Sequence, residues 1–93
     1  MTHAITQTGT SASGTRETIS LSLWEGYGKT RVYIQRELPF KGRSAEQVGF
    51  FDVDADFSIV AGKRQHVGSV EALLSIAFGS VEAAKAAARS LMA

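Results

Sequence analysis

The fold is decided by residues 18–36, which read TISLSLW (18–24), EGYGK (25–29) and TRVYIQR (30–36). TISLSLW and TRVYIQR alternate between aliphatic and other side chains, which is the period of a strand with one buried face. The aliphatic positions are Ile19, Leu21, Leu23, Val32 and Ile34. The opposite face carries Ser20, Ser22, Trp24, Arg31, Tyr33 and Gln35. Because a short glycine-containing turn over 26–28 separates the two runs, the sequence predicts a β-hairpin.

Two more strands are predicted after the hairpin. Residues 38–44 contain Pro39 and Gly42, which favour a loop at the end of the second strand. Strand-like sequence resumes at about 47–53 and again at about 57–61. The predicted sheet therefore has about four antiparallel strands, with the hairpin first.

The hydrophobic period changes to that of a helix in the last third of the chain. The apolar residues of 69–78 fall on one helical stripe, with Ser69 as the expected N-cap and Gly79 as the end. Ser80 is expected to cap a second, alanine-rich helix over 81–92, unless the two segments form one bent helix. An antiparallel sheet packed by one or two C-terminal helices is an α+β fold.

The start of the chain looks different from the rest. Residues 1–16 are rich in Thr, Ser and Gly, with Ile5 as a lone aliphatic residue. Such a segment buries too little apolar surface to offset its ordering entropy. We therefore expect a flexible N-terminal tail over 1–16 and a single domain over 17–93.

The overall composition is that of one small globular domain: 93 residues, 44% hydrophobic and 20% charged. The chain has no cysteine, which excludes disulfides, thiolate metal sites and cysteine nucleophiles. It begins without the apolar run of a secretory signal, and no stretch approaches the roughly 18 apolar residues of a membrane span. These features predict a cytoplasmic protein that does not enter a membrane.

Two segments partly match functional motifs, and each lacks residues that its motif requires. The run GYGKT (26–30) ends like a phosphate-binding loop, but Leu23 replaces the first glycine and a strand follows instead of a helix. The run DVDAD (52–56) begins like a calcium-binding EF-hand loop. Phe57, however, stands at the required glycine and Lys63 at the required glutamate. Neither segment predicts a ligand site.

Catalytic patterns are missing as well. His3 and His66 are the only histidines, and no serine lies in a nucleophile motif. The helix pair around Gly79 has the layout of a helix-turn-helix, but its second helix offers few side chains that read base edges. We therefore predict a non-enzymatic protein with no cofactor and no metal.

Cationic and aromatic residues gather in the middle of the chain. Residues 29–43 contain five Lys and Arg against Glu37 alone, although the whole chain has a net charge of only +1. Aromatic rings stack on bases and cations follow phosphates, so this composition predicts a platform for single-stranded nucleic acid. The candidate binding residues are Trp24, Lys29, Arg31, Tyr33, Gln35, Lys41, Arg43, Lys63 and Arg64.

One further aromatic residue is expected on this platform. Phe50 and Phe51 are adjacent, so they must point to opposite faces of their strand. We expect Phe51 to be the one that joins Trp24 and Tyr33.

The same surface also suits a protein partner. Trp, Tyr and Arg are the residues that dominate protein–protein hot spots. Separate basic (29–43) and acidic (52–56) segments fit a partner of mixed charge. The alternative interpretation is therefore a protein–protein interaction module, an inhibitor or adaptor of phage or mobile-element origin. A homodimer formed through an open sheet edge is a variant of this interpretation.

Overall fold

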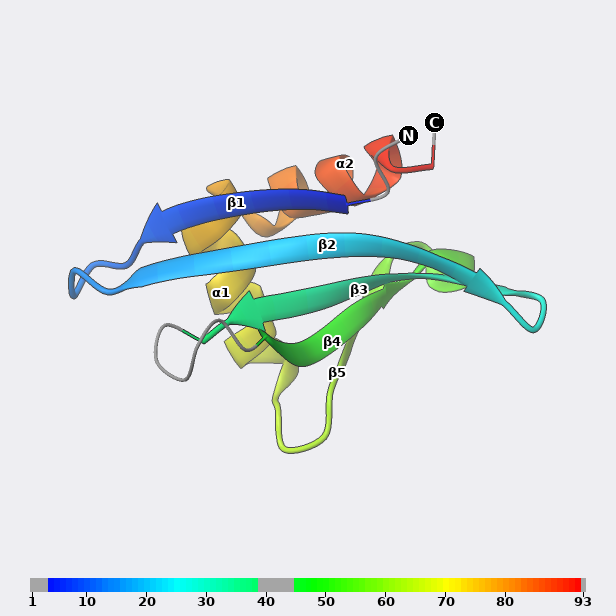
Figure 1. The fold of residues 1–93 in the computed structure, drawn as a ribbon, viewed down its shortest axis with the longest axis horizontal. Helices are drawn as coiled ribbons and strands as arrows, with labels where there is room; N and C mark the ends of the chain where they lie inside the picture. The colour runs from blue at the N-terminus through cyan, green and yellow to red at the C-terminus, as the bar shows by residue number, and fades with distance from the viewer. Residues whose placement is uncertain (1–3, 39–44, 93) are drawn as a thin grey trace.

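The computed structural model describes residues 4–38 and 45–92. They form one antiparallel sheet with the strand order β1-β2-β3-β4-β5, and two helices follow it (Figure 1). The elements are β1 Ala4–Thr10, β2 Arg16–Gly26, β3 Lys29–Glu37, β4 Ala45–Asp52, a 3₁₀ turn Val53–Ala55, β5 Ser58–Ala61, α1 Val67–Phe78 and α2 Val81–Ser90. The predicted α+β fold is confirmed, with five strands where about four were expected.

The hairpin of β2 and β3 is the longest part of the sheet. Its turn consists of Tyr27 and Gly28, whose φ angles of 50° and 72° are both positive. A two-residue turn with two positive φ angles matches the right-handed twist of the flanking strands. The register pairs Gly26 with Lys29 and Trp24 with Arg31, so the two polar faces predicted for the hairpin coincide.

The N-terminal prediction is wrong for residues 4–10, which form β1 instead of a tail. β1 pairs with β2 over seven residues, and the hydroxyls of Thr6 and Ser20 lie 2.8 Å apart across the two strands. An edge strand needs little apolar surface, because backbone pairing and β-branched threonines stabilise it. Gly9 completes the contact: a Cβ built there would collide with the carbonyl oxygen of Ile76. The last turn of α1 therefore packs directly on the β1 backbone.

The helices cover one face of the sheet, as Figure 1 shows. Buried aliphatic and aromatic residues fill the space between the two layers: Ile19, Leu21, Val32, Ile34, Val48, Phe51, Val70, Leu74, Ala77, Ala84 and Ala88. Gly79 ends α1 with a φ of 94°, and the Ser80 hydroxyl accepts from the Ala83 N–H at the start of α2, as predicted. The Ser69 prediction is wrong, because the N-cap of α1 is His66, three residues earlier, and the helix begins at Val67.

The two helices are separate and do not form one continuous rod. They meet at a bend of 76°. Within the described residues no single helix has the length and apolar composition of a membrane span, and this pair reaches both only when taken together.

The β3–β4 pairing contains an irregularity that matters for the open face. The register shifts between Ile34 and Gln35. Ile34 pairs with Gly49 but Gln35 pairs with Gln47, so Val48 is an extra residue in β4. A bulge of this kind changes which β4 residues point to each face. The loop predicted over 38–44, with Pro39 and Gly42, lies almost wholly outside the described residues.

Candidate functional site

The face of the sheet opposite the helices is built from the second set of alternating positions. Strand alternation places Ser20, Ser22 and Trp24 of β2 on this face. Arg31 and Tyr33 of β3 lie beside them. Figure 1 shows both helices on the other side of the sheet. We call the side without helices the open face.

Three aromatic rings and one guanidinium form a continuous group on the open face, which we call the aromatic cluster: Trp24, Arg31, Tyr33 and Phe50. The ring centroids of Trp24 and Tyr33 are 6.1 Å apart, and those of Tyr33 and Phe50 are 5.9 Å apart. Both pairs meet edge to face, at 69° and 64°. This is a favourable arrangement for neighbouring rings, in which they are not stacked on each other.

Arg31 is held in place by two members of the cluster. Its guanidinium carbon lies 4.3 Å from the centroid of Phe50, and its Nη1 donates to the Tyr33 hydroxyl at 3.4 Å. The cation covers a face of Phe50, so the rings of Trp24 and Tyr33 remain the better surfaces for an incoming planar group. All four cluster residues are partly exposed.

Trp24 closes the cluster at the hairpin end. A Cβ built on Gly26 would lie 2.8 Å from the six-membered ring of Trp24, so the indole lies against the Gly26 backbone. The indole is packed at this contact but not buried in the core. The single tryptophan therefore lies at the surface of the open face, where a bound molecule would change its fluorescence.

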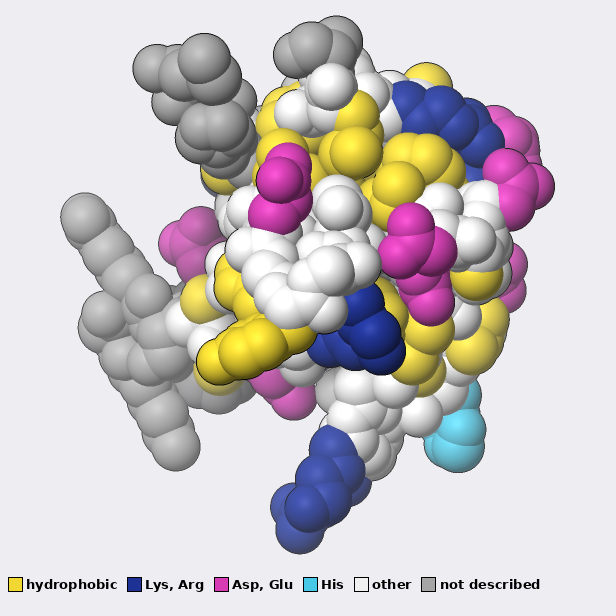
Figure 2. Space-filling view, turned by 90° about the vertical axis from the view of Figure 1, so that its right-hand side faces the viewer, with side chains coloured by type: hydrophobic (Ala, Val, Ile, Leu, Met, Phe, Trp, Pro, Cys, Tyr) yellow, Lys and Arg dark blue, Asp and Glu magenta, His cyan; other side chains and the backbone are white. Residues whose placement is uncertain are grey.

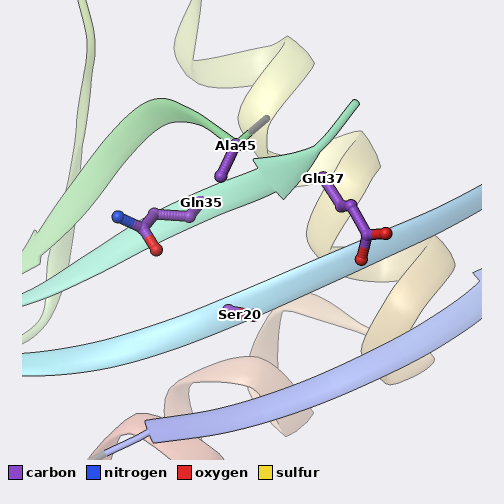
Figure 3. Close-up of a pocket in the computed structure, with 4 residues that line it drawn as sticks. All are labelled: Ser20, Gln35, Glu37 and Ala45. Atoms are coloured by element: carbon purple, nitrogen blue, oxygen red, sulfur yellow. The ribbon is translucent and has the colours of Figure 1, made fainter. Parts of the chain in front are cut away.

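A shallow hollow lies next to the cluster on the same face. It has a volume of about 440 Å³ and is lined by Ser20, Gln35, Glu37 and Ala45 (Figure 3). Gln35 and Glu37 follow Tyr33 on β3 at two-residue spacing, and Ser20 is the register partner of Gln35. The open face thus has an aromatic, cationic half toward the hairpin turn and a polar half with one carboxylate.

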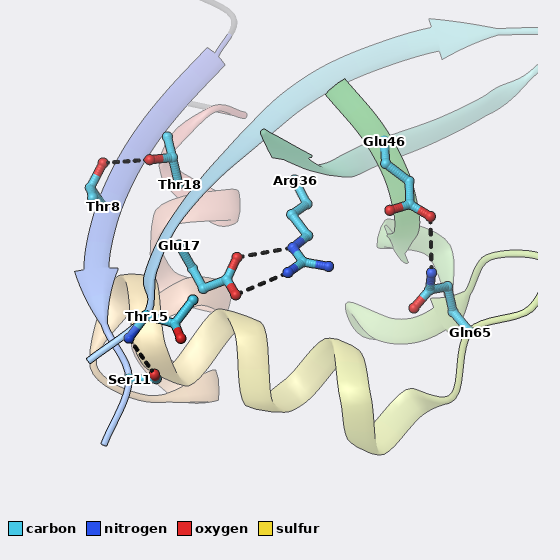
Figure 4. A network of polar contacts seen from close by, with 8 residues as sticks. All are labelled: Thr8, Ser11, Thr15, Glu17, Thr18, Arg36, Glu46 and Gln65. Atoms are coloured by element: carbon cyan, nitrogen blue, oxygen red, sulfur yellow. Dashed lines mark hydrogen bonds and ion pairs between the residues drawn. The ribbon is translucent and has the colours of Figure 1, made fainter. Parts of the chain in front are cut away.

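The helix-covered side contains an ion pair that removes one cation from the predicted basic stretch. Arg36 Nε and Nη2 donate to the two carboxylate oxygens of Glu17 at 2.9 and 3.0 Å (Figure 4). Glu17 is only 8% exposed. This hydrogen bonding raises the pKa of Arg36 above its ordinary value. Arg36 therefore compensates a buried charge and is committed to the inner side of the sheet.

The seven predicted binding residues that the structure describes separate into three groups. The first group shares the open face and consists of Trp24, Arg31, Tyr33 and Gln35. Lys29 is exposed at the start of β3, beside the hairpin turn. Lys63 and Arg64 lie in the connection between β5 and α1, after the edge strand at the far side of the sheet. Lys41 and Arg43 lie outside the described residues.

The choice between the two adjacent phenylalanines was wrong. Phe51 is fully buried in the core, and Phe50 is the ring on the open face, opposite Tyr33 in the register. Alternation alone shows that the two rings point apart but not which one faces the helices. The pairing of Val32 with Phe51 settles the matter, because Val32 belongs to the buried set.

Charge on the molecule is mixed at the hairpin end. Figure 2 shows cationic, acidic and hydrophobic side chains interspersed there, without one uninterrupted basic surface. Asp52 is the register partner of Arg31 and brings a carboxylate next to the aromatic cluster. Asp52 also accepts from the Asp54 N–H at 3.2 Å, so the acidic run 52–56 forms a capped turn. No group of metal-binding side chains occurs among residues 4–38 and 45–92.

A comparison of the chain with protein-family models, with curated proteins and with solved structures finds no match. Function has to be inferred from the residues themselves.

Proposed function

We propose that this chain is a small, non-enzymatic, cytoplasmic domain that binds single-stranded nucleic acid on its open face. The observation that carries the proposal is the aromatic cluster, in which Trp24, Tyr33 and Arg31 lie together on the side of the sheet away from the helices. Exposed rings on a sheet offer stacking surfaces to bases, whatever the sequence.

The residues of the open face make two kinds of contact in this proposal, stacking on bases and binding to phosphates. Trp24 and Tyr33 present their rings to bases, and the planar guanidinium of Arg31 stacks on a base or contacts a phosphate. Lys29, at the end of the same strand as Arg31, contacts the backbone of the bound strand. With so few cations on the open face, we expect weak binding with a shallow dependence on salt.

A protein partner is the second candidate, and the mixed charge favours it. Asp52 beside Arg31, and the carboxylate of Glu37 in the hollow, would repel phosphates but would accept Lys or Arg side chains of a protein. In that case Trp24, Tyr33 and Arg31 form the centre of a protein–protein hot spot.

The experiment that separates these candidates is a titration of Trp24 fluorescence with a mixed-sequence single-stranded oligonucleotide, at low and at moderate salt. The chain has one tryptophan, so the signal has one origin. We expect quenching that weakens as salt is raised. An unchanged spectrum, with no binding of a labelled oligonucleotide by anisotropy at low salt, would reject the nucleic-acid proposal in favour of a protein partner.

Two variants test the assigned residues, and the chain provides a matched control. Tyr33→Ala should weaken oligonucleotide binding about tenfold, the loss of one stacked base. Arg31→Gln should weaken it and reduce the salt slope by about 0.7, the contribution of one phosphate contact on a single strand. Arg89→Gln is the control, because Arg89 also lies over a phenylalanine ring, that of Phe57, but belongs to α2. Equal losses in Arg31→Gln and Arg89→Gln would contradict the assigned face.

A further inference from the structure

The outer edge of β1 is a row of backbone hydrogen-bonding groups without a partner strand. β1 is the end of the strand order, and within residues 4–38 and 45–92 nothing pairs with its outer side. In an antiparallel ladder every second residue turns its N–H and C=O away from the strand it is paired with. β1 is seven residues long, so it offers these groups over a full strand length.

β1 lacks the sequence features that normally keep an edge strand from pairing. Its sequence, AITQTGT (4–10), contains no charged residue and no proline. Its register with β2 runs through all seven pairs without a bulge. The other edge strand, β5, is only four residues long and is followed closely by Lys63 and Arg64. Short edges and nearby charges discourage pairing, and a long, uncharged edge permits it.

We propose that β1 pairs antiparallel with β1 of a second copy of this chain, which joins two five-stranded sheets into one. A second copy is the partner that the strand itself fits, because an uncharged strand meets its own copy without repulsion. A two-fold axis also presents the same edge from both sides. This proposal does not depend on what the open face binds.

The residues of β1 define the register of this pairing. Opposed residues must point to the same side of the joined sheet, which excludes every shift by an odd number of residues. The register that overlaps the whole strand places Ala4 opposite Thr10 of the partner subunit and Gln7 opposite its own copy on the two-fold axis. The exposed Gln7 amides then face each other and can exchange hydrogen bonds. Thr6 meets Thr8 of the partner subunit, the type of hydroxyl pair that both threonines already make with β2.

The joined sheet keeps both helix layers on one side and both open faces on the other. Five strand spacings, about 24 Å across the sheet, separate β3 from its copy. Tyr33 lies level with Ala4, three residues from the axis, so its copy is also displaced by about 20 Å along the strands. The two aromatic clusters are therefore roughly 30 Å apart at Tyr33, on one continuous surface. Any extended molecule that binds the open face could then reach both clusters.

A charge-swap experiment tests the interface on the full chain by analytical ultracentrifugation. The unmodified chain should sediment as a concentration-dependent dimer. Gln7→Lys and Gln7→Glu each place like charges on the axis and should weaken self-association by at least about tenfold. An equimolar mixture of the two variants should restore the dimer. Gln7 is exposed, so both variants should keep the native circular dichroism spectrum. A monomer at all concentrations, or a dimer that both variants leave intact, would overturn the proposal.

A crosslinking experiment tests the register separately. Because the chain has no cysteine, Gln7→Cys introduces a single thiol at the axis, and mild oxidation should give a covalent dimer. Thr10→Cys is the matched control on the same strand. Its copy would lie about 20 Å away along the strand in the same register, too far for a disulfide. Equal crosslinking of both variants would overturn the proposed register.

Discussion

The two faces of the sheet use the same alternating pattern for opposite purposes. On the helix-covered face, Ile19, Leu21 and Phe51 are fully buried. On the open face, Trp24 and Tyr33 lie across the same strands but keep part of their rings in solvent. Burial of apolar side chains stabilises the fold where helices exclude water. The open-face aromatics therefore contribute less to the free energy of folding than the core residues do. Large rings that contribute little to the core are available for binding.

The adjacent phenylalanines of β4 give the sharpest test of this difference. Phe51→Ala should lower the free energy of unfolding by about 3–5 kcal/mol, because it leaves a cavity in the core. Phe50→Ala removes an equal side chain from the open face and should cost about 1 kcal/mol, mainly its contacts with Tyr33 and Arg31. Urea unfolding of both variants measures the two costs. Similar costs would show that the open face is as important for stability as the core.

Gly9 tests how the helix layer holds the edge of the sheet. Gly9→Ala should cost about 2–3 kcal/mol, because the added methyl group collides with the Ile76 carbonyl and must displace β1 or α1. Hydrogen exchange should show early loss of protection in β1 while β2 and β3 stay protected. Gly68→Ala is the control, since a Cβ there meets nothing within 4 Å and alanine favours the helix. A neutral Gly9→Ala would mean that α1 does not fix β1.

The Glu17–Arg36 pair tests whether a charge on the helix-covered side depends on its partner. Arg36→Met should cost about 2 kcal/mol, because Glu17 stays nearly buried without its two hydrogen bonds. Replacing both residues with Met should cost less than Arg36→Met alone, as measured by urea unfolding. The reverse order would show that the pair stabilises the fold outright. The pKa of Arg36 is raised, so the contribution of the ion pair to the free energy of unfolding persists through neutral pH. It is lost only when the pH rises through the raised pKa of Arg36.

Much of this arrangement could be predicted from local sequence. Strict alternation identified the hairpin and assigned Trp24, Arg31 and Tyr33 to one face, because side-chain direction in a strand depends only on position. The end of α1 at Gly79 and the cap at Ser80 were predictable for a similar reason. Both depend on the conformational freedom or hydrogen bonding of one residue.

The features that the sequence did not predict depend on contacts between distant segments. Residues 4–10 become a strand through their pairing with β2 and the approach of Ile76 to Gly9, which composition does not reveal. The roles of Phe50 and Phe51 follow from the pairing of β4 with β3. Arg36 belongs to a basic stretch in the sequence, and only the fold shows that it pairs with Glu17.

A substitution in the hairpin turn should have the smallest effect on the free energy of unfolding, because Tyr27 packs against almost nothing. Tyr27 is 98% exposed and has a φ of 50°, a left-handed conformation that bulky residues adopt at a cost. Asn followed by Gly is the preferred pair for such a turn. Tyr27→Asn should therefore raise the free energy of unfolding by about 0.5 kcal/mol, because it removes strain without losing a packed side chain. A higher urea midpoint together with weaker oligonucleotide binding would mean that the turn accepts this strain to present a fourth aromatic ring. A higher midpoint with unchanged binding would confine the site to the aromatic cluster, and a lower midpoint would contradict the expected relief of strain.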